Sequence, residues 1–505
     1  MTEEETQIES VPIVPPPSGQ AKEFRSAFFD VAPAMFLGTL DQTIIAAALP
    51  AITSSLGGFS YLAWVVSAYL LAATIAAPIY GRMGDAFGRR KMLVWALALF
   101  IAGSVACALS PNLTVLVCAR GLQGFGGGGL MTLSQALIGE VVSPKERGRF
   151  QGWFGANFAL ASTLGPVAGG FLSQHFGWRS IFWVNVPLGI GAAIAALRLK
   201  TSEGTGSCRL DYGGTALFTA STFALLLTLS FGGHELGWTS PILLGLALAA
   251  MIGFILLAGV EKRSADPLIS PILIEEPIIW RAVLSVLLFA AVLFGLIVQL
   301  PLFLQVTLGI SPTVSGLMLI PLTLAQVTVS TATGLRISTT GQPRNSMAIG
   351  LTVVTVGFVA LAAGIRSGPL FIVSLTFLIG AGLGSTMPAA QTMVQWAAGG
   401  KMLGAATAAL SFSRTIGGVI GAALTSAVLL GVLQLVDPGS TAGLTNALAS
   451  VNCGQIHTMQ SSLALIMAFR WMFLTLGALA ACATFLAWSI PNLDLTAAPP
   501  DSSNR

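Results

Sequence analysis

Asp41 is the residue of this sequence best placed to do chemistry, because it is a carboxylate in the middle of an apolar stretch that runs from about residue 28 to residue 52. A charge at bilayer depth is costly, so such an acid persists only where it is paired, reached by water or protonated part of the time. No other carboxylate can be placed so deep inside an apolar stretch of this sequence. Asp41 is therefore predicted to bind and release a proton.

Arg120 is the predicted partner of Asp41. It lies within another apolar stretch, at residues 113–136. If the first stretch runs outward through the bilayer and this one runs inward, both charges lie ~10 Å below the outer surface, at about 1.5 Å per residue. Each charge needs a partner in a medium of low dielectric constant, either directly or through water and Gln123.

Two interpretations of this pair are open. An arginine favours the charged form of a neighbouring carboxylate, whereas burial favours the neutral form. Separating the two charges, or admitting water to them, in one conformation would therefore make Asp41 take up or release a proton. In the other interpretation, the pair is a permanent salt bridge that fixes the packing of the helices.

The elements that must position these groups are predicted to be membrane-spanning helices. Of the 505 residues, 54% are hydrophobic and only 9% are charged, too few to cover a soluble globule of this size. A bilayer core of about 30 Å requires about 20 apolar residues per helix. This criterion predicts fourteen spans, at residues 28–50, 61–80, 92–110, 113–136, 150–173, 179–198, 212–231, 241–260, 282–304, 312–334, 346–365, 369–394, 404–432 and 468–490.

The distribution of charge predicts the orientation. Of the 24 Lys and Arg residues, about nineteen fall on the side of the termini, which the positive-inside rule assigns to the cytoplasm. We therefore expect a multi-pass protein of the plasma (inner) membrane with both termini cytoplasmic. The net charge of +4 follows from this orientation, and no nucleic-acid partner is expected. The five cysteines have no metal-ligand spacing, so neither a metal nor a cofactor is expected.

An internal repeat predicts how the helices are grouped. The glycine run at residues 165–170, in the fifth span, is echoed at residues 417–421, in the thirteenth. Duplicated halves are the architecture of a rocking-bundle transporter, so we expect an all-α fold of two six-helix halves plus two inserted helices. The expected domains are a disordered cytoplasmic tail (1–26), an N-terminal six-helix bundle (27–200), the inserted pair (201–265), a C-terminal six-helix bundle (266–492) and a second cytoplasmic tail (493–505).

The segment 81–91, after the second span, combines glycines with one acid and four bases. Asp85 could accept hydrogen bonds from the N-terminal N–H groups of a neighbouring helix or from an arginine, while Gly81 and Gly88 allow tight turns and close approach. In the functional interpretation these residues form, with Arg89 and Arg90, a gating loop that stabilises one conformation. In the alternative interpretation, the bases only set the topology.

The segment 81–91 resembles the signature of the major facilitator superfamily. The segments 40–50, 120–124 and 165–170 resemble, within that superfamily, the fourteen-span drug:proton antiporter family of multidrug efflux type. Further similar segments lie at 178–187, 210–214 and 301–312, and the resemblance covers residues 25–490.

This resemblance implies roles for particular residues. It assigns Asp41 and Arg120 to proton coupling and the segment 81–91 to gating. It assigns the glycine run to an antiporter-type helix interface, made by Gly165, Pro166, Gly169 and Gly170.

Polar side chains that could contact a substrate are few within the spans. Asn157, Gln299 and Gln305 are candidates, although for each of them a hydrogen bond between helices is the competing interpretation. Arg414 has no acid near it in the sequence, so helix-terminus carbonyls or a water pocket would satisfy it, and contact with an anionic substrate is the alternative. Spans 9–14 contain no acid, which favours neutral, singly cationic or zwitterionic lipophiles over dications and leaves a lipid or natural product open.

The expected function is proton-coupled export of amphipathic or hydrophobic small molecules, by a secondary active antiporter with alternating access. The nearest alternative is an importer, facilitator or transporter of a specific native metabolite or lipid on the same scaffold. A membrane-embedded enzyme would need paired acids or a histidine-based site, and a structural partner of an outer-membrane channel would need a docking pattern. The sequence offers neither. The expected partners are a lipophilic substrate, protons and the lipid bilayer, and a monomer with one pore is sufficient.

Overall fold

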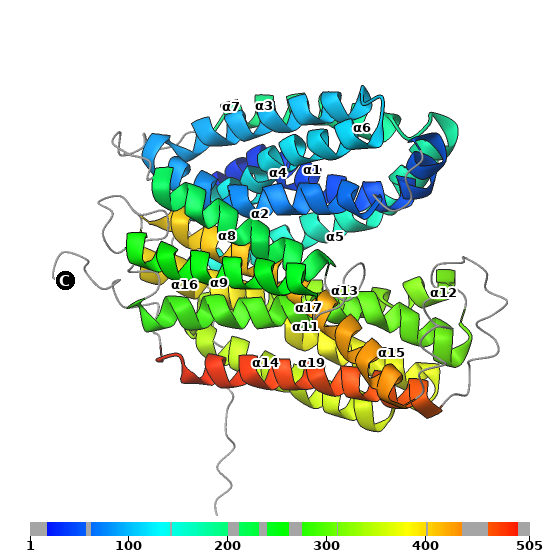
Figure 1. Ribbon diagram of the computed structural model, residues 1–505. Coiled ribbons are helices and arrows are strands. Elements are labelled where there is room, and N and C mark those ends of the chain that lie inside the picture. Colours follow the sequence, from blue (N-terminus) through cyan, green and yellow to red (C-terminus); the bar gives the residue numbers. More distant parts are fainter. Residues whose placement is uncertain are drawn as a thin grey trace, which may run out of the picture.

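The computed structural model describes residues 18–56, 62–141, 144–199, 212–231, 240–261, 275–310, 312–399, 402–436 and 463–492. The regular structure of these residues is helical (Figure 1). The helices are α1 (Ser18–Leu56), α2 (Leu62–Phe87), α3 (Arg89–Ala108), α4 (Leu113–Val141), α5 (Pro144–His175), α6 (Ser180–Trp183), α7 (Asn185–Leu197), α8 (Tyr212–Phe231), α9 (Pro241–Glu261), α11 (Pro277–Leu308), α12 (Pro312–Leu317), α13 (Ile320–Thr340), α14 (Pro343–Ala363), α15 (Pro369–Gly384), α16 (Thr386–Ala398), α17 (Leu403–Val436) and α19 (Leu463–Ser489).

Each predicted span coincides with one helix or with two consecutive helices. Among the described residues, ten such segments are long and apolar enough to cross a membrane. Helices α1, α4 and α5 are also long, at 39, 29 and 32 residues. The prediction of many membrane-spanning helices is thus supported, whereas the count of fourteen stays a prediction.

Three of the predicted spans are broken into two helices, namely α6 and α7, α12 and α13, and α15 and α16. Pro187, Pro321 and Pro388 each lie in the first turn of the second helix of such a pair. Proline has no backbone N–H, and its ring clashes with the carbonyl one turn earlier, so a helix tends to end ahead of it. The first turn of a new helix tolerates proline, which explains where the breaks fall.

Two pairs of helices repeat the same close contact. A Cβ atom on Gly169 of α5 would lie 2.3 Å from the carbonyl oxygen of Ile44 in α1. A Cβ atom on Gly421 of α17 would lie 2.0 Å from the carbonyl oxygen of Ala291 in α11. Glycine is therefore required at both positions for the two backbones to touch.

A second contact repeats in the same way. A Cβ atom on Gly128 of α4 would lie 2.2 Å from the carbonyl oxygen of Ala73 in α2, and one on Gly384 of α15 would lie 2.4 Å from that of Gln326 in α13. The packing among α1–α7 thus recurs among α11–α17, as expected if the second set of helices is a duplicate of the first. Figure 1 shows these two sets largely on opposite sides of the molecule.

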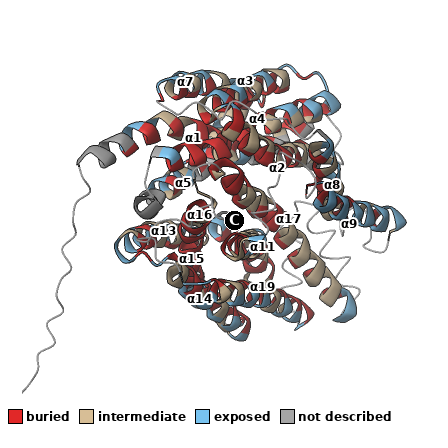
Figure 2. Cartoon of the chain, turned by 90° about the vertical axis from the view of Figure 1, so that its left-hand side faces the viewer, coloured by how far each residue is buried: buried red, intermediate tan, exposed pale blue. Residues whose placement is uncertain are grey.

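Helices α8 and α9 lie at the edge of the bundle, beside α2 and α17 (Figure 2). Phe218 of α8 and Leu257 of α9 share a buried cluster with Ile79 of α2 and Phe412 of α17. The pair therefore packs against both sets of helices. The opposite surface of α9 exposes apolar side chains, which suits contact with lipid; they include Ile242, Leu244, Leu248, Met251 and Ile255.

The first helix begins earlier than predicted. It starts at Ser18, inside the segment 1–26 that was predicted to be a disordered tail. Aromatic packing explains the extension, because the rings of Phe24 and Phe28 lie 6.1 and 5.3 Å from that of Trp153 in α5. The remainder of that tail, residues 1–17, and the predicted tail 493–505 lie outside the described residues.

Candidate functional site

Asp41 of α1 and Arg120 of α4 form a buried ion pair. The Nη1 atom of Arg120 lies 2.7 Å from Oδ2 of Asp41, and each side chain is only 1% exposed. The prediction that these two charges lie at one depth and pair is confirmed. An unpaired charge at this position would be strongly destabilising, so each residue accounts for the presence of the other.

Two amides complete the surroundings of the carboxylate. Gln123 Nε2 and Asn185 Nδ2 both donate to Oδ1 of Asp41, at 2.8 and 2.7 Å. Gln123 also accepts a hydrogen bond from Arg120, at 2.7 Å, so it bridges the ion pair. Hydrogen bonds to a charged group are stronger than those between neutral groups, so the two amides and Arg120 together fix the position of the Asp41 carboxylate.

Asn185 was not predicted as a partner of Asp41. It is the first residue of α7, directly after the break between α6 and α7, and it is fully buried. The signal available in the sequence was an amide side chain two residues before Pro187, at the level of a helix break. The position of a residue along a span can be counted from the sequence, but a single sequence does not show that α7 packs on α1.

Arg120 is further held by α2. Its Nε donates to the carbonyl oxygen of Val65 at 3.1 Å, and its guanidinium lies 4.3 Å from the centroid of the Tyr69 ring. Residues from α1, α2, α4 and α7 therefore enclose one charged cluster. In this conformation the cluster is closed, because Asp41 and Arg120 are almost fully buried.

The segment 81–91 is helical rather than a loop, which corrects the prediction. Helix α2 continues to Phe87 and α3 begins at Arg89, so Gly88 alone separates them. Gly88 has a φ of 95°, a backbone conformation that glycine adopts readily and other residues rarely do. One glycine is enough to reverse the chain, so the remaining residues of the segment can stay helical.

Asp85 connects α2 to the N-terminus of α17. Its carboxylate accepts hydrogen bonds from the backbone N–H groups of Gly404 and Ala405, both at 3.0 Å. These groups have no partner within their own helix, and the positive end of the helix dipole favours a negative charge. Arg89 also donates to Asp85, at 2.5 Å, and forms an ion pair with Glu140 of α4. Both kinds of partner predicted for Asp85 are therefore present.

Gly81 lets the two helices approach closely beside Asp85. A Cβ atom on Gly81 would lie 2.6 Å from Cβ of Ala408 and 2.8 Å from the carbonyl oxygen of Gly404. Arg90 donates to the carbonyl oxygen of Leu199 at 2.9 Å, at the far end of the first set of helices. Gly81 and Asp85 of the predicted gating segment thus lie where one helix set meets the other, whereas the contact of Arg90 is within the first set.

The predicted helix-interface motif is confirmed at two of its positions. Gly165 and Gly169 face α1, and a Cβ atom on Gly165 would lie 1.9 Å from Oγ1 of Thr43. Gly170 does not belong to the interface, because a Cβ atom there would meet nothing within 4 Å. The reason is helical geometry, since positions four residues apart share a face and the next residue turns away. The side chain of Pro166 lies outside the described residues.

Replacing Gly169 by alanine is expected to destabilise the packing of α5 on α1. The added methyl group would overlap the backbone of Ile44, and overpacking of this kind costs about 1–3 kcal/mol. Gly170→Ala is the matched control, because it adds the same group to open space and gains helix propensity of up to about 1 kcal/mol. Thermal unfolding in detergent should show a lowered Tm for the first variant only. An equal Tm for the two variants would contradict the assignment of this interface.

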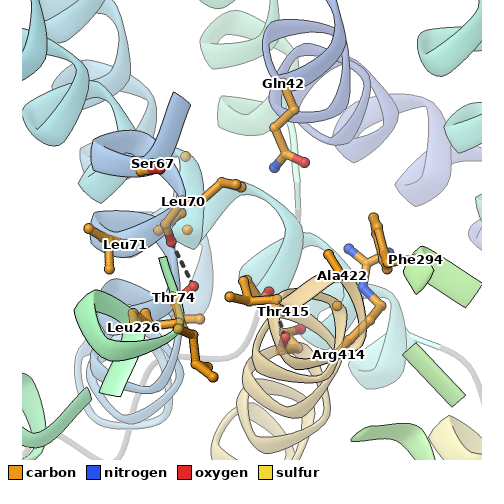
Figure 3. A pocket seen from close by; sticks show the side chains of 18 of the residues that line it. Gln42, Ser67, Leu70, Leu71, Thr74, Leu226, Phe294, Arg414, Thr415 and Ala422 are labelled. Carbon is orange, nitrogen blue, oxygen red and sulfur yellow. Dashed lines mark hydrogen bonds between the residues drawn. The ribbon is translucent and has the colours of Figure 1, made fainter. Parts of the chain in front are cut away.

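A cavity of about 470 Å³ lies between α2, α4, α8, α11 and α17 (Figure 3). Gln42, next to the buried Asp41, points into it from α1. Most of its wall is apolar, and the polar side chains in the wall are Gln42, Ser67, Thr74, Thr132, Ser411, Arg414, Thr415 and Ser426. Asp41 does not line it in this conformation.

Of the four predicted substrate contacts, only Arg414 lines this cavity. Gln299 donates to Ser426 at 2.9 Å and Gln305 to Ser315 at 2.9 Å, so both form the hydrogen bonds between helices that were the competing interpretation. Asn157 is half-buried on α5, away from the cavity. The sequence gives the position of each residue along its span, but not the direction in which its side chain points around the helix.

The comparison with protein families matches residues 31–422 to the Major Facilitator Superfamily. The chain belongs to this superfamily. The multi-pass, all-helical fold predicted from the sequence is thereby confirmed, and family and fold point to a transporter rather than an enzyme.

Curated relatives of the chain are transporters. It is 34% identical over 398 residues to the multidrug transporter protein MdtP of Bacillus subtilis, covering 78% of this chain and 73% of that protein. It is 30% identical to the efflux pump FUS6 of Gibberella fujikuroi, covering 82% and 76%. It is 32% identical to an uncharacterised transporter of Mycobacterium tuberculosis, of whose length the chain spans 62%.

Solved structures share the fold. The human organic anion transporter MFSD10 matches this chain with a TM-score of 0.64 at 17% identity. The match covers 94% of this chain and 100% of MFSD10. The proton:xylose symporter XylE matches 94% and 99% with a TM-score of 0.63, at 14% identity. At these identities the likeness establishes the major facilitator fold alone.

Proposed function

We propose that this chain is a proton-coupled antiporter that exports amphipathic or hydrophobic small molecules from the cell. The observation that carries the proposal is the buried cluster of Asp41, Arg120, Gln123 and Asn185, which adjoins through Gln42 a largely apolar cavity. Relatives described as a multidrug transporter and an efflux pump support export of small molecules.

In this proposal Asp41 is the proton site. Protonation would neutralise the carboxylate and weaken its ion pair with Arg120 and its hydrogen bonds to the two amides. Helix α1 would then be held less firmly to α4 and α7. Because the cluster is closed in the present conformation, a proton reaches Asp41 only after these helices shift, which suits a site that is exposed in one state and sealed in another.

The contact between Asp85 and α17 is the proposed gate. It joins the two sets of helices at the end of α2, which the positive-inside rule assigns to the cytoplasm. The described conformation is then the one closed toward the cytoplasm. Breaking the contact would let the helix sets rock apart on that side, giving alternating access to the cavity.

We further propose, from the resemblance of its sequence motifs, that the chain is a fourteen-span drug:proton antiporter, with six-helix bundles at 27–200 and 266–492 and an inserted pair at 201–265. It lies in the plasma (inner) membrane as a monomer with both termini cytoplasmic. One proton that crosses a potential of 100 mV supplies about 2.3 kcal/mol for export, before any pH gradient is added.

Two alternatives are separated by experiment. One is a facilitator or transporter of a specific metabolite or lipid on the same scaffold, and the other gives the Asp41 and Arg120 pair a purely structural role. The full-length protein in proteoliposomes should move a panel of lipophilic compounds uphill when a pH gradient is imposed, and should stop when an ionophore dissipates the gradient. Transport that only equilibrates the compounds, whatever the gradient, would favour the facilitator and overturn the antiporter.

A further inference from the structure

We infer that the cavity binds lipophilic anions, and that Arg414 binds the anionic head, a carboxylate, phenolate or sulfonate. This inference rests on the proposed export function, because it names the substrate class of the same cavity. It takes up the alternative interpretation of Arg414, and it differs from the expectation drawn from the lack of acids in spans 9–14, which favoured neutral, singly cationic or zwitterionic compounds.

Arg414 stands on the face of α17 that lines the cavity. The lining residues of this helix recur at intervals of three and four, from Ser411 through Arg414, Thr415 and Gly418 to Ser426, as expected for one helical face. Figure 3 shows Arg414 and Thr415 on this helix, across from Leu70 and Thr74 of α2. The arginine is therefore directed to the space between the two sets of helices rather than to lipid.

Among the described residues, no carboxylate forms an ion pair with Arg414. Its guanidinium carbon lies 5.7 Å from the centroid of the Phe158 ring. Such a contact only partly compensates a charge in a site of low dielectric constant. A guanidinium held in this way is suited to bind carboxylate or sulfonate oxygens in pairs.

The described residues of the cavity wall include neither Asp nor Glu, so Arg414 gives this part of the wall a net charge of +1. Asp41, the chain neighbour of the lining residue Gln42, does not line the cavity and is already bound by Arg120, Gln123 and Asn185. A cationic substrate would thus meet an uncompensated positive charge, which disfavours it.

The rest of the wall suits the body of such a molecule. Leu70, Leu71, Leu226, Phe294 and Val298 provide apolar surface. The cavity thus combines one cationic group with an apolar enclosure.

The charge of the exported molecule decides which gradient drives its export. Exchange of one inward proton for one outward monoanion moves two charges across the membrane in the same electrical sense, whereas exchange for a monocation moves none. A membrane potential without a pH gradient should therefore drive export of an anion but not of a cation.

Three probes with one aromatic body test the inference: 1-naphthalenesulfonate, 1-naphthyltrimethylammonium and neutral 1-naphthalenesulfonamide. Titration calorimetry on the full-length protein in detergent should show the sulfonate binding at least about tenfold more tightly than the ammonium compound, as expected for hydrogen bonds to a charged group. Arg414→Gln should remove this preference and Arg414→Lys should keep most of it. Arg336→Gln, at an exposed arginine of α13 outside the cavity, should change nothing. Equal binding of the two charged probes to the wild-type protein would overturn the inference, whatever the variants do.

Transport separates failure of the inference from failure of the proposed function. In proteoliposomes that carry a potassium diffusion potential and no pH gradient, the sulfonate should be moved and the ammonium compound should not. If the sulfonate binds selectively but no gradient moves it, the proposed antiporter function is wrong and the proposed anion-binding site is retained. If a pH gradient moves the ammonium compound while a potential moves neither probe, the antiporter stands and the anion site is wrong.

Discussion

Asp41→Asn is expected to abolish transport driven by a pH gradient, with a loss of at least about 100-fold, equivalent to about 2.7 kcal/mol. The amide cannot take up a proton, so no exchange can be coupled to it. The substitution also leaves Arg120 buried without its carboxylate, at a site only 1% exposed. Breaking a buried pair in this way costs about 3–5 kcal/mol, so the Tm in detergent should fall together with the transport rate.

A double variant separates these two effects. Asp41→Asn combined with Arg120→Gln removes both charges, and replacing both members of a buried pair is far less destabilising than removing one. The double variant should therefore recover much of the Tm but none of the response to the pH gradient. Recovery of proton-driven transport along with stability would show that the pair is a structural salt bridge. Uptake of lipophilic compounds by proteoliposomes with an imposed gradient is the measurement.

Asp85→Asn is expected to shift the protein toward the conformation that is open to the cytoplasm. The variant loses the carboxylate that accepts from Gly404 and Ala405 and pairs with Arg89. A hydrogen bond to a charged group contributes about 1.5–3 kcal/mol, so the balance between conformations should change by about 10- to 100-fold. Transport should fall because one of the two conformations is depopulated.

Thiol labelling measures this shift. Ala77 lines the cavity one turn before Gly81, so Ala77→Cys in a background without native cysteines reports access past the gate. A membrane-impermeant reagent on the cytoplasmic face should label it faster when Asp85→Asn is present. Glu140→Gln is the matched control, because it removes the other carboxylate that pairs with Arg89 and leaves α17 unchanged. Equal labelling in the wild type and Asp85→Asn would mean that Asp85 does not hold the gate.

The sequence predicted the helices and the charge pair because both depend on position along one span. Hydrophobic length marks a span, and a count of residues from its ends placed Asp41 and Arg120 at one level. Chemistry at helix termini likewise predicted that Asp85 would accept from a neighbouring helix. The breaks before Pro187 and Pro388 could not have been predicted from proline alone, because Pro78 and Pro301 lie inside continuous helices.

The parts that were missed depend on rotation about helix axes and on which helices become neighbours. Gln299 and Gln305 turn toward adjacent helices, whereas Gln42 and Thr132, which were not nominated, face the cavity. Asn185 reaches Asp41 because α7 packs on α1, a contact between residues 144 positions apart in the chain. Apolar spans carry weak amphipathic patterns, so a single sequence leaves these directions open.

Proton release on substrate binding tests most directly whether Asp41 exchanges its proton with the exported compound. A compound moved in the proteoliposome panel is added to purified protein in weakly buffered detergent solution with a pH indicator. The wild-type protein is expected to release protons as the compound binds, and the Asp41→Asn, Arg120→Gln double variant, which should retain the fold, is expected to bind the compound and release none. Equal proton release by the two proteins would contradict the account, because another group would then be the proton site.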